Sequence, residues 1–553
     1  MSAVAPGRGA PTVAVPSFGS TLEGTGRLIR FILRRDRARI FWWTFSIVFF
    51  YAYFMVALDA LGAEALVGRA LLMESPSGIV MGGPGYGLDA YTPERAVANE
   101  GITWFVLALG VMSVLHMVRH TRSEEESGRS ELVRANPVGR HAPAVASVVT
   151  LVLVNAVIAV LSAMTLIGIG GEYVTFADSF AITSGVACAS MVFGLVGLVF
   201  AQLTVSGRGA VGLGMVVLGL GFVVRAVGDV AETGGSTLSW FSPFAWAQQM
   251  RPFVDLIWWP ILLSAGSIAI LLLVASVLGS RRDFGGGLLP DRIGPATATA
   301  SLRGPIALAW RQQRFALLVV TAFFAAMWLG VGTMLPTIGE MVGSLIESNP
   351  QFGAVFGDPG DPSGFLGLVM LEGVLFVGAY AIVMGARPKA EENAGRAEIA
   401  LARPVSRTRW FGAHILVTGI GVVIAVAVPI LAVWVGAVAV GFDRQSFGDY
   451  ALVAATYVPS ALCYLGFTVA LYGWFPRATG LGWLLLVYGF VIGLFGSLIQ
   501  DLPEAANYIN PIYWVPGVFE TPDLGEWLGV AVVALGLCVL GMIGFRRRDI
   551  PAV

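Results

Sequence analysis

Two short acidic stretches stand out in an otherwise apolar sequence, and their residues recur at a constant spacing. Each has two adjacent glutamates, then a Gly-Arg pair and a further glutamate, and each leads into a Pro-Val-x-Arg run. The second stretch follows the first by 267 positions, from 124 to 391. Side chains of these types make charge-assisted hydrogen bonds with a protein partner. The candidate docking residues are Glu124, Glu125, Gly128, Arg129 and Glu131 in the first stretch and Glu391, Glu392, Gly395, Arg396 and Glu398 in the second.

The spacing within each stretch suits a helix. On an α-helix Glu124, Gly128 and Glu131 share one face, as do their three counterparts. We therefore expect a single helix over 121–137 and another over 388–404, each with two carboxylates beside a glycine that a partner's backbone can approach. A solvated loop with ordinary helix-stabilising charges is the plainer interpretation of one such stretch, and the second copy weakens it.

Enzyme chemistry is absent from the sequence. Lys389 is the only lysine, and no Gly-x-x-x-x-Gly-Lys-Ser/Thr phosphate loop occurs. There is also no hydrolase elbow, no His-Glu-x-x-His helix and no Cys/His cluster. We predict a protein that is not an enzyme, with no catalytic residue and no metal ligand.

Composition places the chain in a membrane. Hydrophobic residues make up 56% and charged residues 12%, whereas about a quarter of the residues of a soluble domain are charged. The net charge of −1 gives no overall field to attract nucleic acid. The three cysteines lie in apolar runs and predict no disulfide framework.

Apolar runs of about 20 residues, the length of a membrane-crossing helix, predict an all-α polytopic protein with about twelve spans. We expect these near 40–60, 100–118, 144–168, 178–205, 209–229, 256–279, 315–336, 365–385, 411–441, 448–474, 479–499 and 524–545. With a cytoplasmic N-terminus, 29 of the 34 basic residues fall on inner segments. Four fall outside and Arg225 lies within a span, which predicts cytoplasmic N- and C-termini.

Further matches at nearly the same offset indicate two parallel six-helix repeats. Arg281-Arg282-Asp283-Phe284 matches Arg547-Arg548-Asp549-Ile550, and Ser242-Pro243 matches Asn510-Pro511. We expect a disordered cytoplasmic tail over 1–19, a first half over 20–283, a cytoplasmic linker over 284–302 and a second half over 303–553.

Each half opens with a cationic amphipathic stretch. In the first, Leu28, Ile29, Ile32 and Leu33 share one face, and four arginines share another. This pattern suits a helix on the lipid at the inner membrane surface, although a basic flank that only fixes topology has the same signature. Residues 306–314 are a shorter version in the second half.

Aromatic residues and isolated charges mark the spans. The candidate substrate-binding residues Trp43, Phe50, Phe54, Phe324 and Trp328 offer an apolar surface to a lipophilic molecule if they line the space between the halves. Packing against lipid is the alternative.

Three charges and four connecting segments complete the pattern. Arg225 needs a partner in the membrane, and Asp229, one turn later, is the expected one. Glu100 and Glu372 are expected at solvated outer helix ends. The outer segments 61–99 and 336–365 are expected to be long loops with short apolar pieces, and 232–252 and 501–523 to be amphipathic loops that could form an extracellular gate.

These motifs resemble a known family. Acidic residues, Gly-Arg-x-Glu-Leu and Pro-Val-x-Arg between the second and third spans are similar to the coupling-helix region of type-2 ABC exporter permeases, and Arg-Arg-Asp-Phe to their C-terminal ending. The fused two-half length resembles the actinobacterial polyketide-antibiotic (tetronasin-type) resistance and multidrug efflux permeases. The second copy departs from the pattern at Asn393-Ala394 and Ile399-Ala400, so unequal docking sites are expected.

The resemblance implies a permease of the bacterial plasma membrane that exports lipophilic drugs or antibiotics. It implies that the two acidic stretches are coupling helices docking on two copies of a soluble nucleotide-binding ATPase subunit. That partner would bind ATP and Mg²⁺, and this chain would bind no cofactor. A proton-coupled drug antiporter with six plus six helices is the alternative, and it would use Glu100 and Glu372.

Overall fold

The computed structural model describes residues 21–171, 173–283, 285–289, 297–299, 301–348, 361–442, 444–495 and 503–549. Within these ranges the regular structure is helical and contains no strand, which confirms the predicted all-α class. Twelve helices of the same ranges are long and apolar enough to cross a membrane, as predicted. The tail expected over 1–19 lies outside the described residues.

The chain divides into two compact units, residues 1–293 and 294–553. The long helices of the first unit are α3 (Arg37–Asp59), α7 (Ile102–His120), α10 (Ala142–Ile169), α11 (Phe176–Leu203), α12 (Gly207–Ala231) and α14 (Ile261–Arg281). Its shorter helices are α2 (Thr25–Arg35), α4 (Ala63–Glu74), α5 (Pro76–Met81), η1 (Leu88–Ala90), α6 (Pro93–Ala96), the π-helical turn η2 (Val97–Gly101), α8 (Arg122–Glu126), α9 (Arg129–Arg134), η3 (Ser239–Phe241) and α13 (Pro243–Gln248).

The second unit has a similar order of elements. Its long helices are α15 (Pro305–Ser348), α17 (Ser363–Gly385), α20 (Arg407–Ala439), α21 (Phe447–Trp474), α22 (Gly482–Phe495) and α24 (Leu524–Arg547). Its shorter helices are α18 (Arg387–Asn393), α19 (Arg396–Leu401), η5 (Pro476–Leu481), α23 (Glu504–Ile509) and η7 (Pro511–Trp514).

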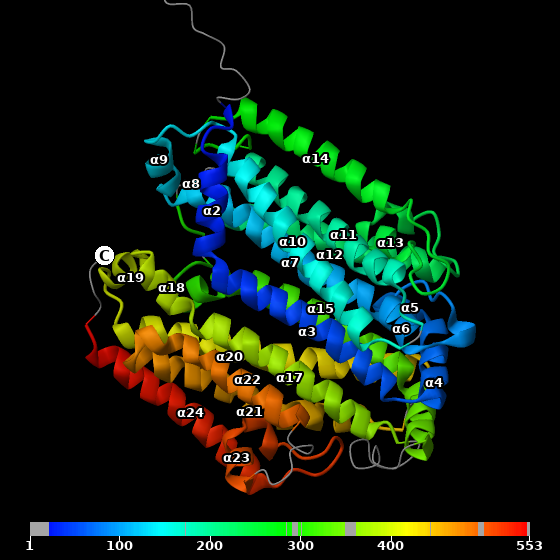
Figure 1. Ribbon diagram of the computed structural model, residues 1–553. Helices are drawn as coiled ribbons and strands as arrows, with labels where there is room; N and C mark the ends of the chain where they lie inside the picture. The colour runs from blue at the N-terminus through cyan, green and yellow to red at the C-terminus, as the bar shows by residue number, and fades with distance from the viewer. Residues whose placement is uncertain are drawn as a thin grey trace, which may run out of the picture. The chain divides into compact units, whose positions relative to one another are not determined.

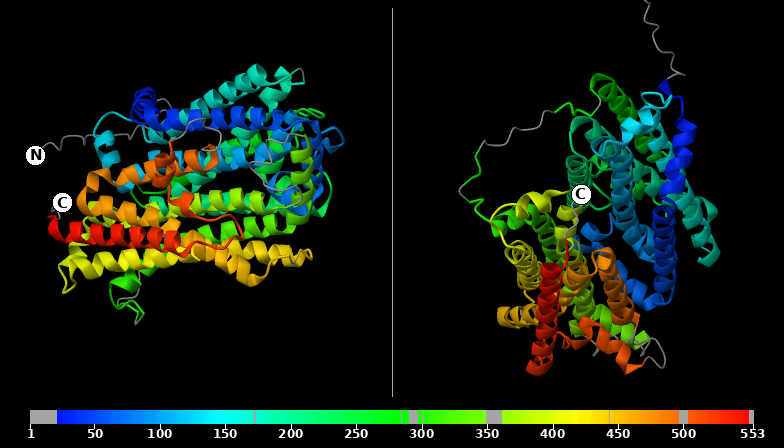
Figure 2. Two further views of the ribbon diagram at one scale, coloured as in Figure 1. Left: turned by 90° about the horizontal axis from the view of Figure 1, so that it is seen from below. Right: turned by 90° about the vertical axis from the view of Figure 1, so that its left-hand side faces the viewer.

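Both units have two distinct ends. In the first, α8 and α9 lie at one end of the long helices, and α4, α5 and α6 lie at the other (Figure 1). In the second, α18 and α19 lie at one end and α23 at the other, and the right-hand view of Figure 2 looks along this bundle. We call the end with α8 and α9, or with α18 and α19, the charged end of its unit, and the opposite end the far end.

One helix forms the centre of each unit. In the first unit α11 packs against α7, α10, α12 and α14, and in the second α21 packs against α17, α20 and α24. The most apolar window of each central helix is 72% buried, against 17% for α3 and 11% for α14. Helices that are apolar on all sides yet exposed at the edge of a bundle are suited to contact with lipid.

Several predicted elements are confirmed and others are wrong. The cationic amphipathic helix is confirmed as α2, with Arg27, Arg30, Arg34 and Arg37 exposed on or beside it. In the second unit the shorter stretch over 306–314 forms the first turns of α15 and is not a separate helix. The loop expected to begin at Pro336 is wrong, since α15 passes through this proline to Ser348.

The connecting segments at the far ends are more ordered than loops. Residues 61–99 fold into the short helices α4, α5, η1 and α6 and part of the turn η2. The matched segments with the repeated proline and tryptophan form η3 and α13 in one unit and α23 and η7 in the other. In each, a tryptophan indole donates a hydrogen bond to the carbonyl six residues earlier: Trp246 to Trp240 at 2.7 Å and Trp514 to Tyr508 at 3.2 Å.

Glycine permits the close crossing of α15 and α20. A Cβ atom added to Gly332 would lie 2.1 Å from the carbonyl oxygen of Val433, and one on Gly436 would lie 2.2 Å from that of Leu329. Backbone atoms cannot yield as a flexible side chain can, so this crossing excludes any larger residue. Small residues of this kind let membrane helices pack at short range.

The crossing yields the first prediction. Gly332→Ala forces α15 and α20 apart and should lower the unfolding free energy by about 1–3 kcal/mol, seen as a lower thermal midpoint in detergent. Gly330→Ala is the matched control, because no atom lies within 4 Å of its added Cβ. Equal midpoints for the two variants would contradict the crossing.

Candidate functional site

Each acidic stretch is built from two short helices. In the first, α8 ends at Glu126 and α9 begins at Arg129, and Gly128 between them has a φ of 72°. In the second, α18 ends at Asn393 and α19 begins at Arg396, and Gly395 has a φ of 68°. The expectation of one continuous helix over 121–137 or 388–404 is therefore wrong.

The glycine explains the break. Left-handed backbone is readily adopted by glycine and costs other residues energy, and it ends a helix. No atom lies within 4 Å of a Cβ added at either glycine, so conformation and not crowding selects this residue. The two glutamates that precede the glycine and the one that follows it thus lie on separate helices.

The second glutamate of the first stretch binds arginines inside its own unit. Glu125 Oε2 accepts from Arg122 Nη1 at 2.9 Å and from Arg282 Nη1 at 2.7 Å, while Glu125 Oε1 accepts from Arg282 Nη2. Arg282 directly follows α14, and its Nε donates to Gln202 Oε1 at 2.7 Å. Two parallel hydrogen bonds of this type fix orientation as well as charge, so α8 is tied to the end of the last span.

The same pair recurs in the second unit. Glu392 accepts two hydrogen bonds from Arg548, at 2.8 Å from Nη1 and 2.6 Å from Nη2. Arg548 directly follows α24, and Tyr472 adds a hydroxyl hydrogen bond to Glu392 at 2.6 Å. Burial lowers the pKa of Arg548, but its bonds to Glu392 and the neighbouring Tyr472 outweigh burial and raise it, so the guanidinium stays charged.

A second pair of arginines attaches the exit of each stretch. Arg140 Nη2 lies 3.1 Å from the carbonyl oxygens of Gly279, Ser280 and Arg282. Arg407, 267 positions later, donates from Nη1 to the carbonyl oxygen of Arg548 at 2.8 Å. Both the entry and the exit of each acidic stretch are therefore bonded to the residues that end the sixth span.

The first glutamate of each stretch is paired differently in the two units. Glu124 Oε1 lies 3.0 Å from Arg35 Nη1, so the first stretch is joined to the amphipathic helix α2. Glu391 instead pairs with Arg396 within the same stretch, at 2.6 Å and 3.1 Å. The two stretches thus have different neighbours, and the expected inequality of their docking sites stays a prediction.

Arg35 belongs to a small polar network beside α2. Its Nη2 lies 2.9 Å from Nδ1 of His120, and because guanidinium only donates, Nδ1 accepts and the Nε2–H of His120 donates to Asp36 at 3.0 Å. Burial raises the pKa of Asp36, but His120 and Arg119 outweigh burial and hold it below its ordinary value. This network ties α2, the end of α7 and the first stretch together.

The tips of the two stretches remain exposed. Glu131 and Glu398 are exposed on α9 and α19, and each is followed by an apolar residue that is largely uncovered. Leu132 is 74% exposed and Ile399 is 68% exposed. We call Glu131 with Leu132 the first tip, and Glu398 with Ile399 the second tip.

Sequence reasoning missed several of these residues. Arg282, Arg548, Arg140 and Arg407 were visible as repeated motifs, but nothing in the sequence showed that they bind the acidic stretches. Leu132 and Ile399 occupy matched positions, and only the structure shows that they are exposed. The signal that could have found all six is their recurrence at nearly the same offset as the glutamates, 266 or 267 positions.

The aromatic candidates divide between the units. Phe324 and Trp328 line one cleft in the second unit together with Val377, Pro429 and Ile430 of α17 and α20. Trp43, Phe50 and Phe54 lie along α3 in the first unit, where Phe50 is 48% exposed. Their role in substrate binding stays a prediction.

The isolated charges at the far end of the first unit are buried and paired. Arg225 Nη1 lies 3.6 Å from Asp229 Oδ2, which confirms the predicted ion pair, and Arg225 also donates to the carbonyls of Ile79 and Val80 at 2.9 Å. The expectation that Glu100 is solvated is wrong. This side chain is buried against Arg69 and accepts from the hydroxyl of Tyr91 at 3.0 Å.

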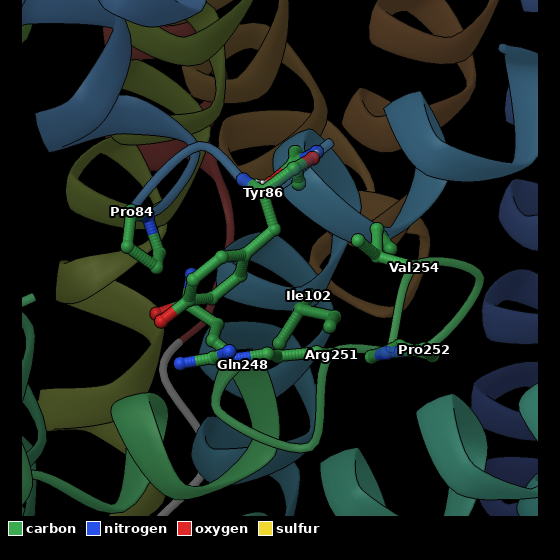
Figure 3. Close-up of a pocket in the computed structure, with 9 residues that line it drawn as sticks. Pro84, Tyr86, Ile102, Gln248, Arg251, Pro252 and Val254 are labelled. Atoms are coloured by element: carbon green, nitrogen blue, oxygen red, sulfur yellow. Dashed lines mark hydrogen bonds between the residues drawn. The ribbon is translucent and has the colours of Figure 1, made fainter. Parts of the chain in front are cut away.

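A small hollow lies beside these pairs. Tyr86 reaches the Gly234 carbonyl at 2.5 Å and Gln249 at 2.7 Å, and Arg251 lies over its ring at 4.6 Å. Figure 3 shows Tyr86 and Arg251 close together beside Gln248. These bonds join the segment 61–99 to the segment after α12 and close the far end of the first unit.

Fold and charged ends together define a multi-pass helical membrane protein with two stretches of similar construction. The chain belongs to the family described as "Multidrug efflux system permease Rv1217c, C-terminal domain", which matches residues 27–281 and 302–546. It is similar to the multidrug efflux system permease protein Rv1217c of Mycobacterium tuberculosis strain H37Rv, with 31% identity over 544 residues that cover 97% of each chain.

The buried ion pair yields the second prediction. Arg548→Ala leaves Glu392 buried without its cation, which should cost about 3–5 kcal/mol and should expose residues 388–404 to protease. The reversed pair, Glu392→Arg with Arg548→Glu, should recover part of that loss because the attraction is restored. Thermal unfolding in detergent and limited proteolysis measure both effects.

Arg547→Ala is the control for this test. Arg547 is exposed and forms no ion pair with the described residues, so its removal leaves Glu392 bound. A control variant as unstable as Arg548→Ala would show that the Glu392 pair is not the cause.

Proposed function

We propose that this chain is the transmembrane permease of an ATP-driven ABC exporter of the type-2 kind, and that its two halves arose by duplication. The two tips dock on two copies of a soluble ATPase subunit that binds ATP and Mg²⁺. The permease moves lipophilic drugs or antibiotics outward across the bacterial plasma membrane. Both termini and both acidic stretches then lie in the cytoplasm, in line with the basic residues of the inner segments.

One observation carries the proposal. In each unit one glutamate–arginine pair attaches the acidic stretch to the end of the sixth span, and the tip stays exposed. The two glutamates are 267 positions apart in the sequence, and the two arginines are 266 positions apart. Bidentate bonds fix the helix that precedes each tip to the bundle, so a separate motor that acts on the tip can pull on the sixth span. The name of the relative, a multidrug efflux permease, supports an outward direction and a broad set of substrates.

The chain's own sequence supports a separate motor. With one lysine, Lys389, and no phosphate loop, it holds no conventional nucleotide site of its own. Energy then comes from a partner, and the tips are the surfaces that suit one. Each presents a carboxylate for a partner's arginine and an apolar side chain whose burial contributes about 1.5–3 kcal/mol.

The third prediction tests docking. Leu132→Ser and Ile399→Ser should each reduce the amount of ATP-binding subunit recovered with the tagged permease from native membranes, and the double variant should lose it. The physical reason is the loss of buried apolar area at each contact. Recovery is measured by quantitative mass spectrometry, and drug-stimulated ATPase activity is measured on the same material.

Leu524→Ser is the matched control, because Leu524 is 70% exposed but begins α24 at the far end of its unit. Full recovery of the ATP-binding subunit with the double variant would contradict docking at the tips.

The fourth prediction separates the two energy sources. Drug uptake by inside-out vesicles should require ATP, stop with vanadate and survive a protonophore. The opposite pattern would establish the proton-coupled antiporter instead.

Reversal of both tip charges, Glu131→Lys with Glu398→Lys, should uncouple ATP hydrolysis from uptake while insertion in the membrane is retained.

A further inference from the structure

Helix α17 contains one charged residue, and it lies deep in the helix. Glu372 is the tenth residue of α17 when counted from Ser363, and every other residue of Ser363–Gly385 is uncharged. At 1.5 Å per residue the carboxylate lies about 14 Å from the start of the helix, well inside a hydrocarbon core about 30 Å thick. Glu372 thus lies about two and a half turns inside α17 and not at its end, and a carboxylate at this depth is costly unless it is paired, reached by water or protonated.

The protein supplies no such partner along this part of the chain. Glu372 is exposed, and no hydrogen bond or ion pair joins it to any residue that the structure describes. The sequence between Arg314 and Arg387 contains no lysine, arginine or histidine. Glu100, at the corresponding place 272 positions earlier, is instead neutralised by Arg69 and Tyr91.

Aromatic rings lie beside the positions that neighbour Glu372 on α17. Phe376, one turn later on the same face, is 54% exposed, and its ring centroid lies 5.0 Å from that of Phe324 on α15. Trp328 packs directly against Gly373, where an added Cβ would lie 1.9 Å from its ring. Glu372 is therefore at the edge of an aromatic surface, next to the cleft that Phe324 and Trp328 line.

We propose that Glu372, Phe376 and Phe324 bind the cationic group of a lipophilic organic cation. This inference rests on the proposed export function and names its substrate class. A carboxylate in a low-dielectric region attracts a monovalent cation strongly, and the faces of aromatic rings add a further attraction. The apolar body of the same molecule packs on the exposed ring of Phe376.

The test compares two probes of similar shape that differ in charge. Binding of tetraphenylphosphonium, a permanent cation, and of triphenylphosphine oxide, which is neutral, is measured on the permease with its ATP-binding partner in lipid nanodiscs. Glu372→Gln should weaken binding of the cation by roughly tenfold relative to the neutral probe. Glu372→Asp keeps the charge and should preserve most of the ratio between the two affinities.

Glu100→Gln is the matched control, since it removes the corresponding carboxylate where arginine already neutralises it. It should lower thermal stability and leave the ratio of affinities unchanged. An unchanged ratio in Glu372→Gln, or an equal loss of both probes, overturns the inference. If the wild-type complex exports neutral lipophiles with ATP but never binds the cation, the cation site is contradicted and the proposed export function is not. If the complex exports no lipophile at all, the proposed export function is contradicted as well.

Discussion

The ion pair between a glutamate of each acidic stretch and the arginine after the last span is the interaction on which both charged ends depend. Glu125 and Glu392 are largely withdrawn from water, so each needs a cation at close range. Arg282 and Arg548 supply it from residues distant in sequence. Helix α8 or α18 therefore cannot shift without disturbing the end of the sixth span of its own unit, so each acidic stretch is attached to its bundle and is not a free loop.

The two units neutralise the glutamates of their acidic stretches with different partners. In the first, Arg122 also donates to the carbonyls of Gly285 and Gly286, and Arg35 brings in the amphipathic helix. In the second, Tyr472 completes the pair, and Arg396 binds Glu391 within the stretch itself. The first stretch is thus bonded to α2 and to the chain that leaves its unit, whereas the second is bonded within itself and to its own bundle. The two ATPase subunits that we propose as partners would therefore meet two tips whose surroundings are bonded differently.

The sequence predicted those features that depend on composition and spacing, and failed where long-range contact decides. Twelve apolar runs, the amphipathic helix and the Arg225–Asp229 pair follow from local patterns. The prediction of a single helix over each stretch was wrong because residue spacing does not show that the glycine at its middle adopts a left-handed conformation. Glu100 looked like a solvated helix end because its partner Arg69 lies 31 residues away, on a segment that reads as a loop. No local pattern encodes such a contact.

The two charged ends have arginines at matched positions, but the two far ends do not. Arg69, Arg225 and Arg251 all bind groups of the first unit, and each closes a contact between the segment 61–99 and its surroundings. In the second unit, residues 315–386 contain no lysine, arginine or histidine, although Glu372 is the counterpart of Glu100. Where the protein neutralises its own carboxylates, it gains fixed structure. Where it leaves one in an apolar setting, the cost of that charge must be offset by a proton, by water or by a bound cation, and we propose that a transported cation does so at Glu372.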